Sequence, residues 1–182
     1  MSAPDPYLRP AFPIADRLRR QLWGIVWTLL FRPSPRPLHA WRRMLLRLFG
    51  ASIGSNCHIY PGARIWAPWN LTCGEVVAVA DGAIIYNPSR IYLGSHSTIS
   101  QEAYLCGATH NYEDLDFALT SAEIYIGEEA WICARATVQS GLRVGPGAVL
   151  ALGSVATRDL EPWTVYAGVP ARKIKQRTRR ES

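Results

Sequence analysis

The chain has 182 residues, 48% of them hydrophobic and 19% charged, which is ordinary for one soluble globular domain with a modest appendage and argues against disorder. The net charge of +6 is concentrated in arginines near the two ends, so charge alone allows nucleic acid, anionic lipid or a phosphate-bearing cofactor as a partner. The 14 Gly and 13 Pro predict many turns.

The cysteines and the apolar runs indicate the cellular compartment of the protein and whether it spans a membrane. The four cysteines are far apart and form no C-x-x-C pair, which argues against a zinc cluster or a disulfide framework and favours a reducing cytoplasm. The N-terminus MSAPDPYLRP lacks the features of a secretory signal, and the longest apolar stretch, Leu22 to Phe31, is about half the length of a membrane-spanning helix. We therefore expect a cytoplasmic protein without a membrane span.

The front of the chain is expected to form two short helices, over residues 16–31 and 38–49. The sequence RPSPRP separates them, and its three prolines forbid a continuous helix. Both segments are rich in apolar residues and tryptophan and are flanked by arginines. We favour a cap over the open end of the repeat structure that follows. An interfacial helix pair on anionic lipid, at the inner face of the membrane, is the alternative for residues 1–50.

From Ile53 onward, aliphatic residues recur every six positions, a period that fits neither an isolated helix nor a simple hairpin sheet. Such a unit predicts a triangular coil of three short strands, with the aliphatic residue inside. A sandwich of short strands is the alternative, but its strands would be spaced irregularly. The aliphatic positions are Ile53, Ile59, Ile65, Leu71, Val79, Ile85, Ile91, Leu93, Ile99, Leu105, Ile126, Ile132, Val138, Val144 and Leu150.

Small residues usually follow these aliphatics by four positions and are expected in the tight corners. Glycines directly after the aliphatic, such as Gly94 and Gly127, are expected in turns where a side chain would be costly. The predicted corner residues are Cys57, Ala63, Ala83, Ser89, Ser97, Ala103, Thr109, Ala130, Ala136, Ala148 and Ser154.

The six-residue spacing is offset twice by two residues. It is then interrupted at residues 106–123, CGATHNYEDLDFALTSAE. Insertions in a repeat architecture form loops on one face, and such loops often carry the binding surface. We therefore predict a β-helix over residues 51–170, an excursion loop over 110–123, and a basic tail over 171–182.

The sequence resembles the hexapeptide-repeat acyltransferases. Residues 126–174, IGEEAWICARATVQSGLRVGPGAVLALGSVATRDLEPWTVYAGVPARKI, are similar to the end of the sugar O-acetyltransferases, while LWGIVWTLLFRPSPRPLHAWRRMLLRLFGASIG and SHSTISQEAYLCGATHNY resemble the colanic acid biosynthesis acetyltransferases. The resemblance spans about residues 21–177. It implies a mainly β fold, the left-handed parallel β-helix, and a homotrimer with active sites between neighbours. It also implies direct acetyl transfer from acetyl-CoA to a sugar or lipid-linked glycan in exopolysaccharide assembly, without a metal or nucleic acid.

His110 lies at the mouth of the excursion and matches the family's catalytic base in the motif THNYED. A histidine there can take a proton from a sugar hydroxyl as that oxygen attacks a thioester, then return it to the leaving thiolate. His39 falls in the basic front segment, and His58 and His96 are expected to point outwards. A zinc carbonic anhydrase on this fold would need a second histidine five residues after the first, where this chain has Leu115.

The partners of His110 are less defined by sequence. Glu102, Asp114, Glu123 or a backbone carbonyl could orient its ring. Asp114 is also assigned to acceptor binding together with Asn87, which falls where the sugar-acetylating relatives place a polar substrate-binding residue. A plain turn role explains Asn87 equally well.

The resemblance places the donor along an edge of the β-helix between subunits. Arginine and lysine suit the nucleotide phosphates through charge-assisted hydrogen bonds. A catalytically silent scaffold or binding module is the alternative function, and the intact His110 and the closing AGVPARKI argue against it. The expected groove residues are Trp131, which could instead be simple packing, Ala134, Leu152, Thr157 and Arg158, with Arg172 and Lys175 at the phosphates.

Overall fold

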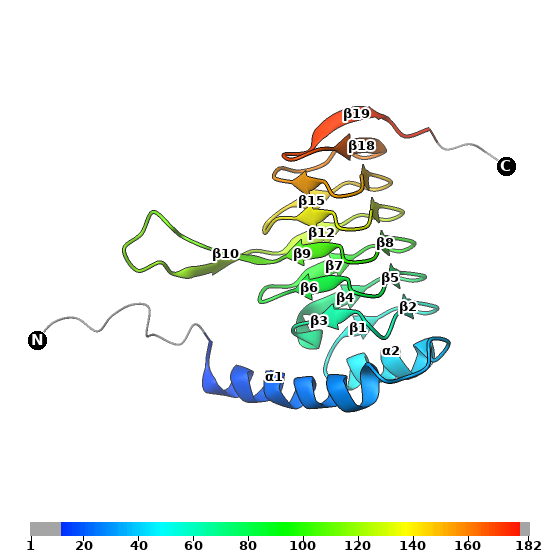
Figure 1. The fold of residues 1–182 in the computed structure, drawn as a ribbon, viewed down its shortest axis with the longest axis vertical. Helices are drawn as coiled ribbons and strands as arrows, with labels where there is room; N and C mark the ends of the chain where they lie inside the picture. Colours follow the sequence, from blue (N-terminus) through cyan, green and yellow to red (C-terminus); the bar gives the residue numbers. More distant parts are fainter. Residues whose placement is uncertain (1–11, 179–182) are drawn as a thin grey trace, which may run out of the picture.

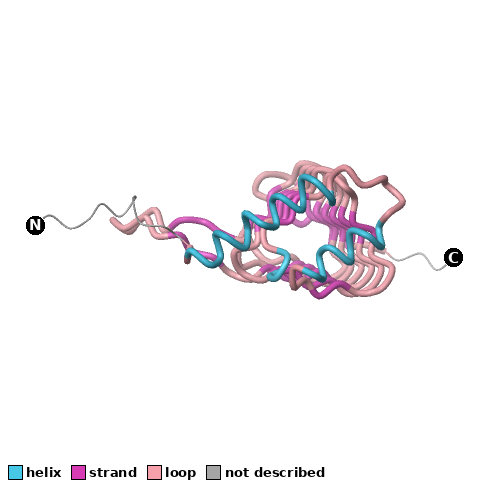
Figure 2. The backbone as a smooth tube through the Cα atoms, turned by 90° about the horizontal axis from the view of Figure 1, so that it is seen from below, coloured by secondary structure: helices cyan, strands magenta, loops and turns pink. Residues whose placement is uncertain are grey.

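Residues 12–178 of the computed structural model form a stack of triangular coils, with two helices lying across its first coil (Figures 1 and 2). Residues 1–11 and 179–182 lie outside the described residues. They include part of the predicted cap segment and tail, and the N-terminal stretch on which the expectation of no secretory signal rests.

Each face of the triangle is a sheet, and every coil contributes one strand to each face in turn. The first face has the order β1-β4-β7-β12-β15, the second β2-β5-β8-β13-β16-β18-β19, and the third β3-β6-β9-β14-β17. Neighbouring strands pair in parallel, as the predicted parallel β-helix requires, except that β19 returns antiparallel to β18. The predicted tail therefore begins as a strand that extends the second face.

The strands are two to five residues long. On the first face they are β1 (Ser52–Ile53), β4 (Leu71–Cys73), β7 (Ile91–Leu93), β12 (Ile124–Ile126) and β15 (Arg143–Val144). On the second face they are β2 (His58–Ile59), β5 (Ala78–Val79), β8 (Thr98–Ile99), β13 (Trp131–Ile132), β16 (Val149–Leu150), β18 (Thr164–Ala167) and β19 (Arg172–Gln176). On the third face they are β3 (Arg64–Ile65), β6 (Ile84–Tyr86), β9 (Tyr104–Cys106), β14 (Thr137–Val138) and β17 (Val155–Ala156).

The interior of the prism is the aliphatic stack that the repeat predicts. Every predicted aliphatic position is buried, the most accessible being Ile53 at 5% exposure. Equivalent residues of successive coils lie in register, for example Ile59, Val79 and Ile99 on the second face. Burial of this continuous column is the main source of stability in a stack whose coils contact only their neighbours.

The glycines after the aliphatics are needed because the coils stack closely. A Cβ added to Gly94 would come 2.5 Å from the backbone nitrogen of Glu128, and one added to Gly127 would come 2.5 Å from that of Pro146. The backbone of the next coil blocks a side chain there, so close stacking is the reason for glycine at these positions.

All departures from the regular coil fall on one edge, which we call the arm edge. Here each coil passes from the third face to the first face of the next. The short 3-10 turn η3 (Pro68–Asn70) and the turn containing Asn87 absorb the two slips of two residues, and the long excursion leaves from the same edge. Two predicted corner residues on this edge are wrong, because Ser89 is only half-buried and Thr109 lies exposed in the excursion. The residues buried at these corners are Ala67 and Asn87.

The two front helices form close to their predicted places. They are α1 (Ile14–Val26), continued by the π-helical turn η2 (Trp27–Phe31), and α2 (His39–Leu48). Among the residues that the structure describes, no helix has both the length and the apolar character needed to cross a bilayer.

The helices lie across the first coil and supply hydrogen-bond donors to it (Figure 1). The carbonyls of this coil that point towards the helices have no coil beneath them to bond, so they would otherwise be unsatisfied. Long arginine and tryptophan side chains from the helices reach these carbonyls instead. The pairs are Arg47 with Ile53, Arg43 with Cys57, Arg42 with Ile59, Trp27 with Ala63, and Trp23 with Ile65, at 2.6–3.1 Å.

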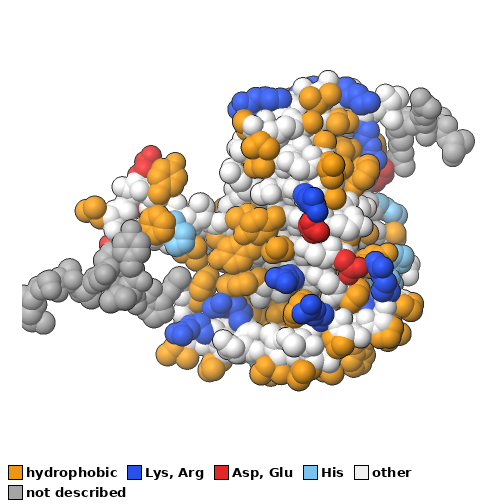
Figure 3. All heavy atoms as spheres, in the orientation of Figure 1, with side chains coloured by type: hydrophobic (Ala, Val, Ile, Leu, Met, Phe, Trp, Pro, Cys, Tyr) orange, Lys and Arg blue, Asp and Glu red, His pale blue; other side chains and the backbone are white. Residues whose placement is uncertain are grey.

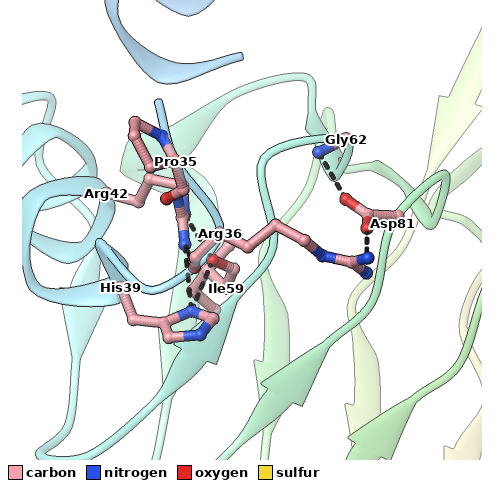
Figure 4. A network of polar contacts seen from close by, with 7 residues as sticks. All are labelled: Pro35, Arg36, His39, Arg42, Ile59, Gly62 and Asp81. Carbon is pink, nitrogen blue, oxygen red and sulfur yellow. Dashed lines mark hydrogen bonds and ion pairs between the residues drawn. The ribbon is translucent and has the colours of Figure 1, made fainter. Parts of the chain in front are cut away.

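Arg42 is the centre of this cap (Figure 4). Its side chain is 0% exposed, and its Nε donates to the Ile59 carbonyl at 2.6 Å. Its Nη atoms donate to Ser34 Oγ and to the carbonyls of Pro35 and Arg36. Burial, more than the Arg42 charge, lowers the pKa of the adjacent His39 ring and so favours its neutral form.

Candidate active site

The excursion is an antiparallel hairpin that projects from the coils as an arm (Figure 1). Its strands are β10 (Ala108–His110) and β11 (Leu119–Ser121), with His110 opposite Leu119. The chain leaves the coil at Gly107, directly after β9, so the excursion begins three residues earlier than predicted. His110 therefore lies out on the arm, at the end of its first strand, and not at the end of a coil.

The imidazole of His110 is oriented by the arm itself. Its Nδ1 lies 2.8 Å from the backbone carbonyl oxygen of Phe117, and its ring stacks on the Phe117 ring with 4.4 Å between centroids. A carbonyl oxygen can only accept a hydrogen bond, so Nδ1 must carry the proton. The lone pair is then on Nε2 of an exposed ring, which is the form a general base requires.

The carboxylates considered as orienting groups are bonded elsewhere. Glu102 forms an ion pair with Arg135 at 2.7 Å, Asp114 accepts a hydrogen bond from Asn111, and Glu123 accepts one from the Tyr125 hydroxyl. Of the four alternatives, the backbone carbonyl is the one that the structure places at the His110 ring.

Serines of neighbouring coils hold the neck of the arm. From one side, Ser89 Oγ donates to Ser121 Oγ at 2.7 Å. From the other, Ser140 Oγ donates to the Gly107 carbonyl at 3.0 Å and accepts from the backbone N–H of Ala122 at 3.0 Å. The repeat gave no sign of this role, because Ser89 was predicted to fill a corner and Ser140 stood outside the pattern.

Asn87 is buried and bonded to the backbone of the preceding coil. Its Oδ1 accepts from the Ala67 N–H at 2.9 Å, and its Nδ2 donates to the Ala67 carbonyl at 2.8 Å. With a side chain 0% exposed, its amide has no open path to an acceptor in this chain. The turn interpretation of Asn87 is therefore the one that the structure favours.

An aromatic hollow of about 490 Å³ opens on the third face, between the helices and the second coil. Its lining includes Trp23, Trp27, Trp66 and Tyr86, with Arg20 stacked 4.2 Å over the Trp66 ring. Tyr86 pairs with Cys106, the residue just before the arm leaves, so the hollow lies one strand from the base of the arm. Figure 3 shows hydrophobic side chains gathered on the coils beside the arm. The sequence placed Trp23 and Trp27 in the first helix, offered no role for Trp66, and gave no indication of the hollow.

The predicted donor-binding residues are distributed over one face and two edges. Trp131 and Lys175 lie in one outward-facing row of the second face, joined by the pairings of Trp131 with Val149, Val149 with Val165, and Val165 with Lys175. The Trp131 side chain is 45% exposed, and its indole N–H donates to Ser100 Oγ at 2.8 Å.

The remaining donor-binding residues lie at the rims of the faces. Ala134 and Leu152 occupy equivalent turns of successive coils at the edge between the second and third faces, where the Gly153 N–H donates to the Ala134 carbonyl. Thr157 and Arg158 follow β17 on the arm edge, and the exposed Arg172 pairs with Ala167 at the end of the stack.

One chain does not bring His110 to Trp131, Ala134 or Leu152. The third face separates the arm edge from the edge that carries Ala134 and Leu152, and Figure 2 shows the arm pointing away from the prism. Among the described residues, no group of three histidine, cysteine or acidic side chains is placed to hold a metal ion. Within one chain the oriented imidazole of His110 is therefore separated from Ala134 and Leu152.

A triangular coil of six-residue units, broken once by an arm that presents an oriented histidine, defines the class of hexapeptide-repeat acyltransferases. The chain is 38% identical over 166 residues, 91% of each protein, to an Escherichia coli strain K12 protein that carries the name colanic acid biosynthesis acetyltransferase WcaF. It belongs to the same family of hexapeptide-repeat acetyltransferases. No protein-family model matches the chain.

Solved structures share the fold at lower sequence identity. A hexapeptide-repeat acetyltransferase of Vibrio cholerae, complexed with acetyl-CoA, aligns with a TM-score of 0.82 at 20% identity and covers 93% of both chains. A galactoside acetyltransferase in complex with coenzyme A aligns with a TM-score of 0.76 at 23% identity, over 91% of this chain and 84% of the other.

Proposed function

We propose that the protein transfers an acetyl group from acetyl-CoA to a hydroxyl of a sugar or glycan, with His110 as the general base. The observation that carries this proposal is the bond from His110 Nδ1 to the Phe117 carbonyl, which leaves Nε2 able to accept a proton. A fixed tautomer on an exposed arm suits a proton-transfer role better than a scaffold role.

The transfer proceeds in one ternary complex. Nε2 takes the hydroxyl proton as the acceptor oxygen attacks the thioester carbonyl carbon. The tetrahedral intermediate then collapses, the carbon–sulfur bond breaks, and the imidazolium returns the proton to the leaving thiolate. The acetyl group passes directly to the acceptor, no covalent enzyme intermediate forms, and His110 ends in the tautomer in which it began.

Acetyl-CoA is the proposed donor because the relatives named above are acetyltransferases and the solved neighbours hold acetyl-CoA or coenzyme A. The exposed Trp131 and Leu152, with Ala134, Thr157 and Arg158, are proposed to line the pantetheine groove. The exposed Arg172 and Lys175 at the end of the second face provide positive charge for the nucleotide phosphates. A cytoplasmic location is part of this proposal, because acetyl-CoA is made and used there.

A saccharide is the proposed acceptor. WcaF is named for colanic acid biosynthesis, which supports a polysaccharide unit or its lipid-linked precursor. The aromatic hollow on the third face offers flat apolar rings beside Arg20 and Arg64, a lining suited to the mixed apolar and polar surface of a sugar ring. Asp114, on the exposed arm, is proposed to meet an acceptor hydroxyl.

A homotrimer completes the site in this proposal. The arm of one protomer points away from its own prism, so its histidine can reach the donor groove only on a neighbour. A cyclic trimer would repeat this contact three times and close on itself. Each site would then combine His110 of one chain with Trp131 and Leu152 of another.

Calorimetric titration with acetyl-CoA separates the enzyme from a silent scaffold. We expect saturable heat for the wild type, and about tenfold weaker binding for Trp131→Ala because the exposed indole no longer packs against the donor. Trp41→Ala, which removes an exposed indole at the far end of the molecule, should bind as the wild type does. Absence of saturable heat with the wild type would support the scaffold.

A further inference from the structure

The two cap helices carry apolar side chains on the side that faces away from the coils. Along α1 and η2 these residues are spaced by four, four, three and four positions, which places them in one stripe of a helix. All are more than half exposed. They are Ile14, Leu18, Leu22, Ile25 and Leu29, at 71%, 64%, 56%, 56% and 64% exposure.

The second helix adds a stripe beside the first. Trp41, Met44 and Leu48 of α2 are all exposed, Leu48 the most. The Trp41 indole N–H donates to the Leu30 carbonyl at 3.0 Å and so ties α2 to η2. Figure 2 shows both helices lying across the base of the prism, and Figure 3 shows hydrophobic side chains along that base. We call these eight residues the base face.

Capping the first coil does not explain the base face. The opposite side of the same helices does the capping, through buried Trp23, Phe31, Leu45 and Leu46. A helix that only covers the end of a stack in water needs one apolar side and would carry polar residues on the other. An apolar surface of this extent on a single face indicates a partner.

The charge of residues 12–50 indicates which kind of partner the base face binds. Residues 12–50 contain eight arginines and one acidic residue, Asp16, giving a net charge of +7. Arg42, Arg43 and Arg47 are turned towards the coil carbonyls, whereas Arg17 and Arg32 are exposed near the two ends of the longer stripe. Neither Arg17 nor Arg32 forms an ion pair with a described residue. Apolar side chains flanked by arginines match the chemistry of an anionic phospholipid surface.

We propose that the base face docks the protein onto an anionic lipid bilayer, with the helices lying in the headgroup region. A second copy of the chain is a poorer fit, because packing two base faces together would also bring together two segments of +7. The inference is independent of the proposed activity, since it rests on the cap helices and involves neither His110 nor the donor groove.

Vesicle flotation of the full chain tests this inference. We expect the wild type to float with vesicles of phosphatidylcholine and phosphatidylglycerol, and to float less with phosphatidylcholine alone or at high salt. The double variant Leu18→Glu with Leu29→Glu should lose binding by at least about tenfold, because two inserted side chains become anionic. Both positions are exposed, so circular dichroism should report an unchanged fold.

A matched control places the same change at the other end of the stack. Ile174, 60% exposed on β19, is replaced by Glu, and this variant should float as the wild type does. Flotation of Leu18→Glu with Leu29→Glu at the wild-type level would overturn the inference, and so would a wild type that does not bind anionic vesicles. If the wild type does not bind vesicles but forms larger assemblies, and the double variant does not form them, the base face would be assigned to a second copy of the chain.

Discussion

Replacing His110 by Ala is expected to lower the rate of acetyl transfer by about 10²–10⁴-fold, the usual contribution of a general base. The hydroxyl of the acceptor would then have to lose its proton to water while it attacks the thioester. The fold should be unaffected, because the exposed ring is held by the Phe117 carbonyl and ring, which belong to the arm itself. Acetyl-CoA binding should also persist, since Trp131, Ala134 and Leu152 of the proposed donor groove lie away from the arm edge.

The measurement is thiol release with an authentic acceptor, with folding and acetyl-CoA binding followed in the same preparation. His58→Ala is the matched control, because His58 is exposed on the first coil and stacks on His39, far from the arm. It should turn over at the wild-type rate. Undiminished turnover by His110→Ala would remove His110 from the mechanism.

Replacing Arg42 by Met is expected to destabilise the protein by about 1–3 kcal/mol, the cost usually found when a buried hydrogen-bonding group loses its partner. Methionine fills part of the volume but leaves the Arg36 carbonyl without its donor. The carbonyls of Ile59 and Pro35 lose the Arg42 bond and keep only their contacts with His39 Nδ1 and the Leu38 N–H. The cap would then lose its central link between the helices and the first coil. Chemical denaturation measures the loss.

Arg36→Ala is the control for this variant. The Arg36 side chain is exposed and pairs with Asp81 at 2.8 Å, and such surface pairs contribute about 0–1 kcal/mol (Figure 4). The backbone carbonyl of Arg36, which accepts from Arg42, is retained. Equal losses from Arg42→Met and Arg36→Ala would show that buried hydrogen bonding of Arg42 does not hold the cap.

The interior of the fold could be predicted from sequence because the position of a residue in the six-residue unit decides whether it points inwards. Ile59 and Ile99 both occupy the aliphatic position of their six-residue units, and both are buried. The rule failed on the arm edge, where the coils take up extra residues. Thr109 has the spacing of a corner residue but lies on the arm, since the chain left the coil at Gly107.

The environment of the site was harder to predict because backbone atoms provide much of it. The carbonyl of Phe117 orients His110, and a carbonyl is present at every residue, so sequence offers no signal that selects it. The arginines near the N-terminus illustrate the same limit. Arg42 and Arg43 suggest a basic surface by composition, but their side chains reach carbonyls that are open to them only because no coil lies beneath the first one.

Among the proposed donor-binding residues, one arrangement could be predicted from the repeat and another could not. The stacking of Ala134 below Leu152 follows from their separation of one regular coil, which the sequence shows. The alignment of Lys175 with Trp131 does not, because β19 runs antiparallel to β18 and the repeat carries no information about that reversal.

A crystal structure of the protein with coenzyme A is the most direct test of a catalytic histidine in a site shared between chains. We expect the sulfur atom of a coenzyme A bound along Ala134 and Leu152 of one protomer to lie within about 3–4 Å of His110 Nε2 of its neighbour, or one water away. Coenzyme A bound to a protomer whose groove no His110 approaches would contradict both the shared site and the proposed base.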